Sequence, residues 1–293
     1  MKELIFKGCG TALFTPFKDG ALDEAALAAC VDRQVAAGVH FLVPLGTTGE
    51  TPCLSVKERQ RVLAITRDHA GRLPLLAGGG TNSLEGTLEN MRQLQEADAF
   101  LVVVPYYNKP TQEGMYEYFK AVAGATDKPV VIYNVPGRTG ANIKAETTLR
   151  LAEEVENIVA VKEASGNYAQ IAEIIRCKPR GFSVLSGNDD ETLSLMATGA
   201  DGVVSVASNV APREMVLLTE ALQRDDMPAA RALHYRLFPL FKALFVESNP
   251  IPGKAAMAQL GLMENSLRLP LVPASAATEA LMAQVLKDLQ PWK

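Results

Sequence analysis

The chain has 293 residues, of which 48% are hydrophobic and 21% are charged, with 22 Gly and 17 Pro. This ordinary globular composition excludes a disordered tail, a linker or a fibre. The net charge is −4, from 29 Lys and Arg against 33 Asp and Glu, and like charges form no runs, so neither nucleic acid nor an anionic membrane is an expected partner.

The N-terminal segment and the cysteines suggest a cytoplasmic protein. Residues 1–17 lack the long apolar segment and cleavage site of a signal peptide, and the longest strongly apolar run, residues 99–104, is too short to span a membrane. The four cysteines show neither CxxC nor zinc spacing, and the three histidines lie apart from one another. We therefore expect reduced thiols, no bound metal and no other cofactor.

Short β-branched segments alternate with amphipathic helical patterns along most of the chain. The predicted strands are residues 9–14, 39–45, 73–77, 100–104, 129–133, 158–162, 183–185 and 202–206. The predicted helices are residues 24–36, 55–69, 84–96, 112–125, 145–155, 168–176, 191–198 and 212–223. The second helix begins with Ser55 and Glu58 in the capping-box pattern. Eight consecutive strand–helix units of about 27 residues favour a closed (β/α)8 TIM barrel.

The strand pattern stops after Arg224. Residues 229–246, 252–260 and 274–289 have helical patterns separated by breaks that contain proline. We therefore predict a catalytic barrel over residues 1–224 and a C-terminal helical appendage over residues 225–293. The alternative fold, an open doubly wound sheet, needs a glycine fingerprint after its first strand, where this chain has Thr15-Pro16-Phe17.

Lys162 is the strongest candidate for chemistry, because active sites of such barrels lie at the carboxyl ends of the strands. It ends an apolar segment and shares a strand face with Ala160, so it can point into the barrel. An apolar interior favours the neutral amine, the form that attacks a carbonyl carbon. Tyr133, 29 residues earlier, occupies the same level of the preceding strand, where its phenol can carry protons. Alternatively, the lysine reaches solvent and the tyrosine fills the barrel end.

Polar residues also follow other predicted strands. Thr47 and Thr48 lie in a glycine-flanked turn whose hydroxyl and N–H groups suit a small carboxylate, and Arg138 can hold a carboxylate through two hydrogen bonds. Each alone is also consistent with turn capping or a surface charge. The glycine-rich segment 77–81 follows the third strand rather than the seventh or eighth, so we expect close backbone contact there and not a phosphate site.

Four motifs occur in order along the chain. They are Gly46-Thr47-Thr48-Gly49-Glu50, Tyr106-Tyr107-Asn108-Lys109-Pro110, Tyr133-Asn134-Val135-Pro136-Gly137-Arg138-Thr139-Gly140 and Val161-Lys162-Glu163-Ala164. Together with Asn249-Pro250-Ile251-Pro252 in the appendage, they resemble the 4-hydroxy-tetrahydrodipicolinate synthase (dihydrodipicolinate synthase) family of pyruvate-dependent class I aldolases and lyases. The resemblance covers nearly the whole chain. It implies a carbon–oxygen lyase that condenses pyruvate with L-aspartate 4-semialdehyde through a Schiff base, in the diaminopimelate pathway to L-lysine.

The resemblance also implies catalytic roles for four residues. Lys162 forms the imine with pyruvate and Tyr133 transfers protons. Thr47 links Tyr133 to Tyr107, which the family pattern supplies from the neighbouring subunit. Since members of the family are typically homotetramers built as dimers of dimers, the resemblance implies that a dimer is the smallest complete catalytic unit.

Four further residues correspond to substrate-binding positions of the family. Thr48 holds the pyruvate carboxylate, and Arg138 receives the carboxylate of the semialdehyde at the entrance of the site. Gly187 and Val204 line the pyruvate pocket. These assignments come from the resemblance and not from composition or spacing.

An inter-subunit pocket for L-lysine is a further feature of lysine-sensitive members. The matching positions here are Thr51, Val56, Arg59, Asn82, Glu85 and Tyr106. Many sensitive bacterial enzymes carry histidines where this chain has Val56 and Arg59, and their glutamate corresponds to Glu85 or to Gly86, depending on the alignment. An arginine repels a cationic effector, and valine cannot replace a hydrogen bond. We therefore expect feedback inhibition by L-lysine to be weak or absent.

The nearest alternative is another pyruvate-dependent class I aldolase, such as an N-acetylneuraminate lyase or a keto-sugar-acid aldolase. The Thr47-Thr48 pair and Arg138 favour the synthase, because neuraminate lyases have Ser-Thr in the first motif and lack this arginine. A barrel that only binds a partner is disfavoured because Lys162 and Tyr133 are both present. A metal-dependent aldolase is disfavoured because the sequence has no histidine cluster.

Overall fold

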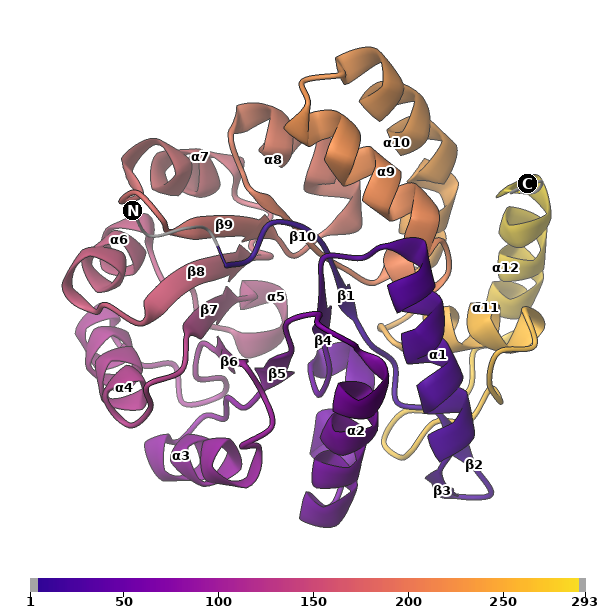
Figure 1. Ribbon diagram of the computed structural model, residues 1–293, viewed down its shortest axis with the longest axis horizontal. Coiled ribbons are helices and arrows are strands. Elements are labelled where there is room, and N and C mark those ends of the chain that lie inside the picture. The colour runs from indigo at the N-terminus through magenta and orange to yellow at the C-terminus, as the bar shows by residue number, and fades with distance from the viewer. Residues whose placement is uncertain (1–4, 290–293) are drawn as a thin grey trace.

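The computed structural model describes residues 5–289 as a closed barrel of parallel strands (Figure 1). Its strands are β1 (Gly8–Ala12), β4 (Phe41–Val43), β5 (Leu76–Gly78), β6 (Ala99–Val103), β7 (Val130–Asn134), β8 (Ile158–Glu163), β9 (Ser183–Ser186) and β10 (Gly202–Ser205). The order around the barrel is β4-β1-β10-β9-β8-β7-β6-β5. Closure between β4 and β5 uses hydrogen bonds of 3.0 Å from Leu42 N–H to the Pro74 carbonyl and from Gly78 N–H to the Pro44 carbonyl. The predicted (β/α)8 barrel is confirmed, and the open-sheet alternative is wrong.

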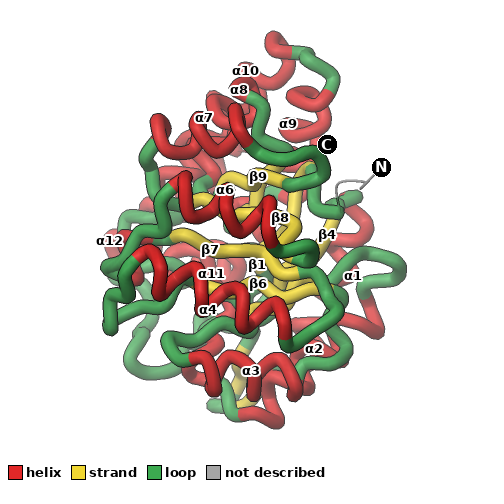
Figure 2. Tube along the Cα trace, turned by 90° about the vertical axis from the view of Figure 1, so that its left-hand side faces the viewer, coloured by secondary structure: helices red, strands yellow, loops and turns green. Residues whose placement is uncertain are grey.

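Helices lie around the outside of the strands in Figure 1, and in the side view of Figure 2 several red helices lie in front of the yellow strands. The barrel helices are α1 (Glu24–Ala37), α2 (Val56–His69), α3 (Leu84–Gln93), α4 (Gln112–Gly124), α6 (Ala145–Glu154), α7 (Tyr168–Cys177), α8 (Thr192–Thr198) and α9 (Pro212–Gln223). The appendage contains α10 (Met227–Ala243), α11 (Ile251–Gln259) and α12 (Ala276–Leu289). Helix α10 packs on α9, and α12 packs on both α10 and α11.

Several short elements lie outside the predicted pattern. They are β2 (Phe17–Lys18), β3 (Ala21–Leu22), the short helix α5 (Pro136–Thr139) and the 3₁₀ turns η1 (Thr47–Gly49), η2 (Thr51–Cys53), η3 (Asp189–Glu191) and η4 (Ala207–Asn209). Asp19 and Gly20 join β2 to β3 with φ angles of 51° and 79°, the conformation that an Asp-Gly hairpin turn requires. Helix α5 has proline at its first position and Gly140 as a left-handed cap, the usual start and stop signals of a helix. Each of these elements spans only two to four residues, which is too short for hydrophobic periodicity to indicate it.

The ends of the elements shift slightly from the predicted ranges because local backbone conformation sets them. The strand expected over residues 39–45 is shorter, since Leu45 adopts a φ of 60° that extended chain cannot have. The capping box is present as predicted: Ser55 N–H donates to Glu58 Oε2 at 2.9 Å, and Glu58 N–H donates to Ser55 Oγ at 3.3 Å.

Alternation along the strands divides the core into an outer layer and a barrel interior. In β7, Val130 and Ile132 pack toward the helices, whereas Val131 and Tyr133 face the interior cluster. Ala160 of β8 belongs to the same interior cluster. Two residues further along β8, Lys162 therefore faces inward at the carboxyl end of the barrel.

Helix α11 is the part of the appendage closest to the barrel mouth. Its residues Ile251 to Met257 are all buried. Gly253 lies so close to Phe14, at the end of the first barrel segment, that an added Cβ would come within 2.3 Å of its ring. The appendage thus packs against the end of the barrel where sites form. None of the helices within residues 5–289 combines the length and apolar character needed to cross a membrane.

Candidate active site

Lys162 and Tyr133 are neighbours at the carboxyl end of the barrel. They form a register pair between the parallel strands β7 and β8, as the repeat length predicts. Lys162 Nζ lies 4.1 Å from the centroid of the Tyr133 ring, and both side chains are only 7% exposed. The lysine does not reach bulk solvent from the strand end. The strands therefore place a primary amine against the ring of a tyrosine in a largely buried position, and a lysine in such a position is a candidate for imine chemistry.

The turn after β4 carries the two threonines. Thr48 is 4% exposed, and its Oγ1 accepts a hydrogen bond of 2.9 Å from Asn249 Nδ2. The carbonyl of Asn249 in turn accepts a hydrogen bond of 3.2 Å from Arg138 Nη2. Arg138 lies in the short helix α5 and not in an open loop, so its backbone is fixed. Two predicted carboxylate-binding residues are thus joined through one residue of the appendage.

Sequence reasoning did not assign Asn249 a role, although its motif was part of the resemblance. Its side chain is 6% exposed, and its Oδ1 accepts no hydrogen bond from any described residue. The available signal was a polar residue directly before Pro250-Ile251-Pro252. Because this motif lies 201 positions from Thr48, nothing in the local pattern indicated the contact.

Gly187 and Val204 belong to the two strand segments that follow β8 around the barrel, Gly187 just after β9 and Val204 within β10. Gly187, directly after β9, donates its N–H to the Glu163 carbonyl at 2.6 Å. Val204 in β10 is 1% exposed and belongs to the interior cluster that contains Tyr133. Both residues are therefore at the same side of the barrel as Lys162, where the resemblance puts the pyruvate pocket.

A cavity of about 580 Å³ opens from this end of the barrel. On one side its lining includes Thr47, Tyr133 and Arg138. On the other side it extends between α2 and α3 and is lined by four of the expected effector positions, Thr51, Val56, Arg59 and Tyr106. One cavity therefore joins Thr47, Tyr133 and Arg138 to the candidate effector side. Its lining does not include Lys162, Thr48, Gly187 or Val204.

The two other expected effector residues do not line this cavity. Asn82 uses its carbonyl to accept a 2.8 Å hydrogen bond from Asn108, and Glu85 is exposed in the first turn of α3. Glu89 and Asn90 line the cavity instead, one helical turn further along α3. Asn90 Oδ1 accepts a hydrogen bond of 2.8 Å from Arg59 Nη1, which holds that guanidinium at the cavity wall.

Tyr107 does not join the site of its own chain. Its side chain is 88% exposed, and its backbone has a φ of 73°, a conformation that few non-glycine residues adopt. Its N–H donates to the carbonyl of Thr139 at 3.3 Å, which ties the loop to α5. Tyr106 is 40% exposed and turns toward the cavity. The loop thus presents one tyrosine to its own chain and one to the surroundings.

Glu163, next to Lys162, faces the opposite side of β8 and is fully buried. Its carboxylate accepts hydrogen bonds from Asn134 Nδ2 at 2.8 Å, Gln170 Nε2 at 3.0 Å and Ser165 Oγ at 2.6 Å. Burial raises the pKa of Glu163, although these hydrogen bonds oppose the rise. This network fixes the end of β8, and with it the backbone of Lys162.

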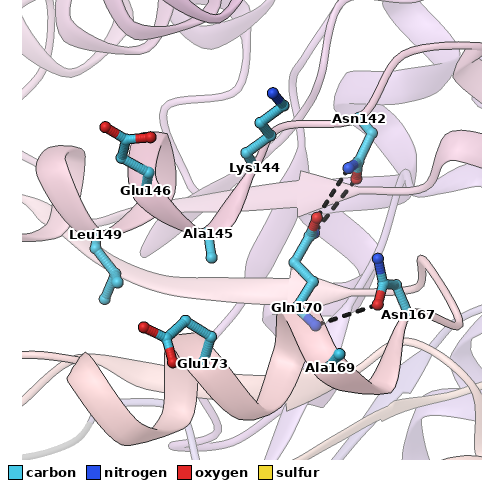
Figure 3. Close-up of a pocket in the computed structure, with 9 residues that line it drawn as sticks. All are labelled: Asn142, Lys144, Ala145, Glu146, Leu149, Asn167, Ala169, Gln170 and Glu173. Carbon is cyan, nitrogen blue, oxygen red and sulfur yellow. Dashed lines mark hydrogen bonds between the residues drawn. The ribbon is translucent and has the colours of Figure 1, made fainter.

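A second, open pocket of about 690 Å³ lies between α6 and α7 on the outside of the barrel (Figure 3). Gln170 of α7 joins the two sides, because its Oε1 accepts a hydrogen bond of 2.8 Å from Asn142 Nδ2, before α6. Its backbone N–H donates to Asn167 Oδ1 at 3.2 Å, which caps α7. None of the predicted site residues lines it. Within residues 5–289, no group of three or more His, Cys, Asp and Glu side chains is placed to hold a metal ion.

Comparison with known proteins gives a consistent answer. The model of the dihydrodipicolinate synthetase family matches residues 5–289. The 4-hydroxy-tetrahydrodipicolinate synthase of Thermotoga neapolitana is 47% identical over 290 residues, covering 97% of this chain and 99% of the relative.

Two solved structures are also similar over almost their full length. The dihydrodipicolinate synthase of Thermotoga maritima has a TM-score of 0.96 and 46% identity, over 97% of this chain and 99% of that one. An enzyme of the same name from Cyanidioschyzon merolae, solved with lysine bound, has a TM-score of 0.94 and 39% identity over 98% and 99% of the two chains. The chain belongs to the dihydrodipicolinate synthetase family.

Proposed function

We propose that this chain condenses pyruvate with L-aspartate 4-semialdehyde to 4-hydroxy-tetrahydrodipicolinate, a step of the diaminopimelate pathway to L-lysine. The observation that carries the proposal is the buried pair of Lys162 and Tyr133, whose Nζ and ring centroid are 4.1 Å apart at the mouth of the barrel. The chain's membership of the dihydrodipicolinate synthetase family, and its similarity to proteins named 4-hydroxy-tetrahydrodipicolinate synthase, support the same reaction.

The chemistry begins at the Lys162 amine. Neutral Nζ attacks C2 of pyruvate, and loss of water from the carbinolamine gives an imine. Loss of a proton from C3 then gives an enamine, which forms a carbon–carbon bond to the aldehyde carbon of the second substrate. The amino group of that substrate displaces Lys162 from C2, which closes the ring and frees the enzyme. Tyr133, whose ring lies against the reacting nitrogen, has the proton-transfer role in this proposal through its hydroxyl.

The remaining site residues orient the substrates. Thr48 binds the pyruvate carboxylate through its hydroxyl and the backbone N–H groups of its turn. Arg138, held by the Asn249 carbonyl, receives the carboxylate of the semialdehyde. Gly187 and Val204 complete the pyruvate pocket with small and apolar surface.

A second copy of the chain completes the site. In this proposal the exposed Tyr107 of one copy enters the site of the other copy. There Thr47 links it to Tyr133, so that the three hydroxyl groups can pass protons. We therefore propose a homotetramer, built as a dimer of dimers, that works in the cytoplasm without a cofactor. Residues 1–224 form the catalytic barrel of each copy, and residues 225–293 form its helical domain.

We further propose that L-lysine inhibits this enzyme weakly or not at all. The similar enzyme from Cyanidioschyzon merolae was solved with lysine bound. In this chain, the effector side of the cavity presents the Arg59 guanidinium, fixed by Asn90, and the apolar Val56, while the Glu89 carboxylate is paired with Arg92. A cationic amino acid meets charge repulsion there and lacks a hydrogen-bond partner at Val56.

Borohydride trapping tests the proposed function. Wild-type protein is incubated with pyruvate and sodium borohydride, and its intact mass and peptides are measured. One reduced three-carbon adduct per chain, on the peptide that contains Lys162, is expected. Lys162→Ala should give no adduct, whereas Lys144→Ala, which removes an exposed lysine outside the cavity, should react like the wild type.

Adduct formation on another lysine, or none at saturating pyruvate, would overturn the proposal. Consumption of pyruvate with L-aspartate 4-semialdehyde, and not with a sugar aldehyde, then separates the synthase reaction from the other pyruvate-dependent aldolases.

A further inference from the structure

A fully buried ion pair connects the appendage to the turn after β4. Lys254 Nζ of α11 lies 2.5 Å from Glu50 Oε1, and both side chains are 0% exposed. Lys254 Nζ also donates to the Ser266 carbonyl at 2.9 Å and lies 4.2 Å from the centroid of the Phe17 ring. The other carboxylate oxygen, Glu50 Oε2, accepts the Arg268 N–H at 3.0 Å. Both oxygens of Glu50 are therefore held by the appendage.

Such a pair is poorly suited to general stabilisation. Removing two charges from water costs roughly what their attraction returns, so apolar residues of similar volume often stabilise a core equally well. Burial lowers the pKa of Lys254, and the Glu50 carboxylate opposes that effect by favouring the ammonium form. Removal of either partner would leave one charge buried without its counterion. The pair therefore imposes a strict positional condition on the two segments that it joins.

The segment that Glu50 fixes is the turn with the two threonines. Glu50 ends η1 with a φ of 52°, a left-handed conformation that its surroundings must hold in place. Its N–H donates to the Thr47 carbonyl at 3.2 Å, and its carbonyl accepts the Cys53 N–H at 2.8 Å. A displacement of Glu50 would therefore move Thr47 and Thr48 with it. Thr48 has a second, independent tie to the appendage through Asn249.

We propose that Lys254 is a positioning residue that acts through Glu50 to fix the Thr47–Thr48 turn for the carboxylate of pyruvate. This inference rests on the proposed function, because it takes Thr48 as the group that receives that carboxylate. Charge matching between the appendage and the turn then sets the affinity for pyruvate, while Lys254 never touches the substrate.

The test measures imine trapping across a pyruvate titration in the full-length protein. Lys254→Met leaves the Glu50 carboxylate buried and unpaired, and should raise the half-saturating pyruvate concentration about tenfold or more. In the double variant Glu50→Gln/Lys254→Met neither charge of the pair remains, and the neutral amide oxygen still accepts the backbone N–H of Arg268. Its half-saturation should return to within about threefold of the wild type.

A matched control is Lys178→Met, which breaks the largely buried Lys178–Asp201 pair near the amino ends of β9 and β10. This variant should lower thermal stability but leave pyruvate half-saturation unchanged. If Lys254→Met has the same half-saturating pyruvate concentration as Lys178→Met, the Lys254–Glu50 pair is only structural and the inference is overturned.

Should Lys254→Met fail to fold, Glu50→Gln keeps the test open. Lys254 then retains its hydrogen bond to the Ser266 carbonyl, and we expect a rise in half-saturation of about threefold or more. A half-saturating pyruvate concentration in Glu50→Gln equal to that of the wild type would overturn the inference. The proposed function fails separately, if the wild-type protein itself forms no adduct.

Discussion

Gly78 gives a sharp test of how closely the barrel strands approach beneath the site. It ends β5, and a Cβ added there would lie 1.9 Å from the Leu45 carbonyl oxygen and 2.6 Å from the Leu45 carbonyl carbon. Both contacts are with backbone, which cannot rotate away as a side chain can. The next residue, Gly79, provides a matched control, because a Cβ there would lie 3.4 Å from Met91 Cγ, close to ordinary contact.

Gly78→Ala must therefore move the Leu45 backbone, two residues after β4, away from β5 by about 1 Å, and overpacking of this kind costs about 2–3 kcal/mol. In a chain of this size the melting temperature should fall by roughly 5–10 °C. Because Leu45 leads directly into the turn with Thr47 and Thr48, kcat/KM should also fall, by about 100-fold.

The assay compares both variants with the wild type by thermal unfolding and by steady-state kinetics. Gly79→Ala should stay within about 0.5 kcal/mol in stability and within about twofold in kcat/KM. The reasoning is refuted if Gly78→Ala and Gly79→Ala have the same stability and the same kcat/KM, because a Cβ at position 78 would then fit without displacing the Leu45 backbone.

Three further predictions concern charge, assembly and regulation. The Arg268 guanidinium lowers the pKa of Glu58 from 4.5 to about 2, so the pair stabilises the fold above about pH 4.5 and this contribution is lost as the pH falls toward 2. In urea unfolding, the free energy of unfolding of Glu58→Gln should be about 1–2 kcal/mol below that of the wild type at pH 7, and this difference should shrink below pH 4.5. A difference that does not change with pH would contradict the prediction. Dimers that combine one Tyr107→Phe chain with one Lys162→Ala chain should regain activity, because one of their two sites has an intact Lys162 and receives an intact Tyr107 from the other chain. Mixed dimers that are verified but inactive would count against a tyrosine that acts between subunits. In a lysine titration, half-inhibition should lie well above the submillimolar range, and inhibition below it would show that Arg59 does not repel the effector.

The barrel and the Lys162–Tyr133 pair could be predicted because both depend on short periods. Alternation of two residues along β8 decides which side chains face the interior, and a repeat of about 27 residues aligns one strand with the next. The spacing of 29 residues between Tyr133 and Lys162 is close to one repeat, and the observed register pairs them after a shift between Val130 and Val131 that the periods do not predict. The close backbone approach at Gly78 and Gly80 was also predictable, because a run of residues without side chains indicates such contact.

Contacts between distant parts of the chain could not be predicted in this way. Asn249 and Thr48 are 201 positions apart, and the local pattern around each is satisfied by turn formation alone. The side chain of Lys254 is 0% exposed in α11, where a lysine in a helical sequence is ordinarily expected at the surface. Only the path of the appendage across the barrel mouth reveals the partners of these residues.

The appendage therefore contributes more to the site than its helical pattern indicates. A barrel forms its mouth from separate loops, and each loop can shift independently unless something joins them. Here Asn249 joins the Thr48 turn to Arg138, and Lys254 joins the same turn to α11. Hydrogen bonds and ion pairs of this kind have strict distance and angle requirements, whereas the attraction between apolar groups is not directional. Groups that must bind two carboxylates at a fixed separation are better held by such ties, which is a physical reason for burying charge beside an otherwise apolar core.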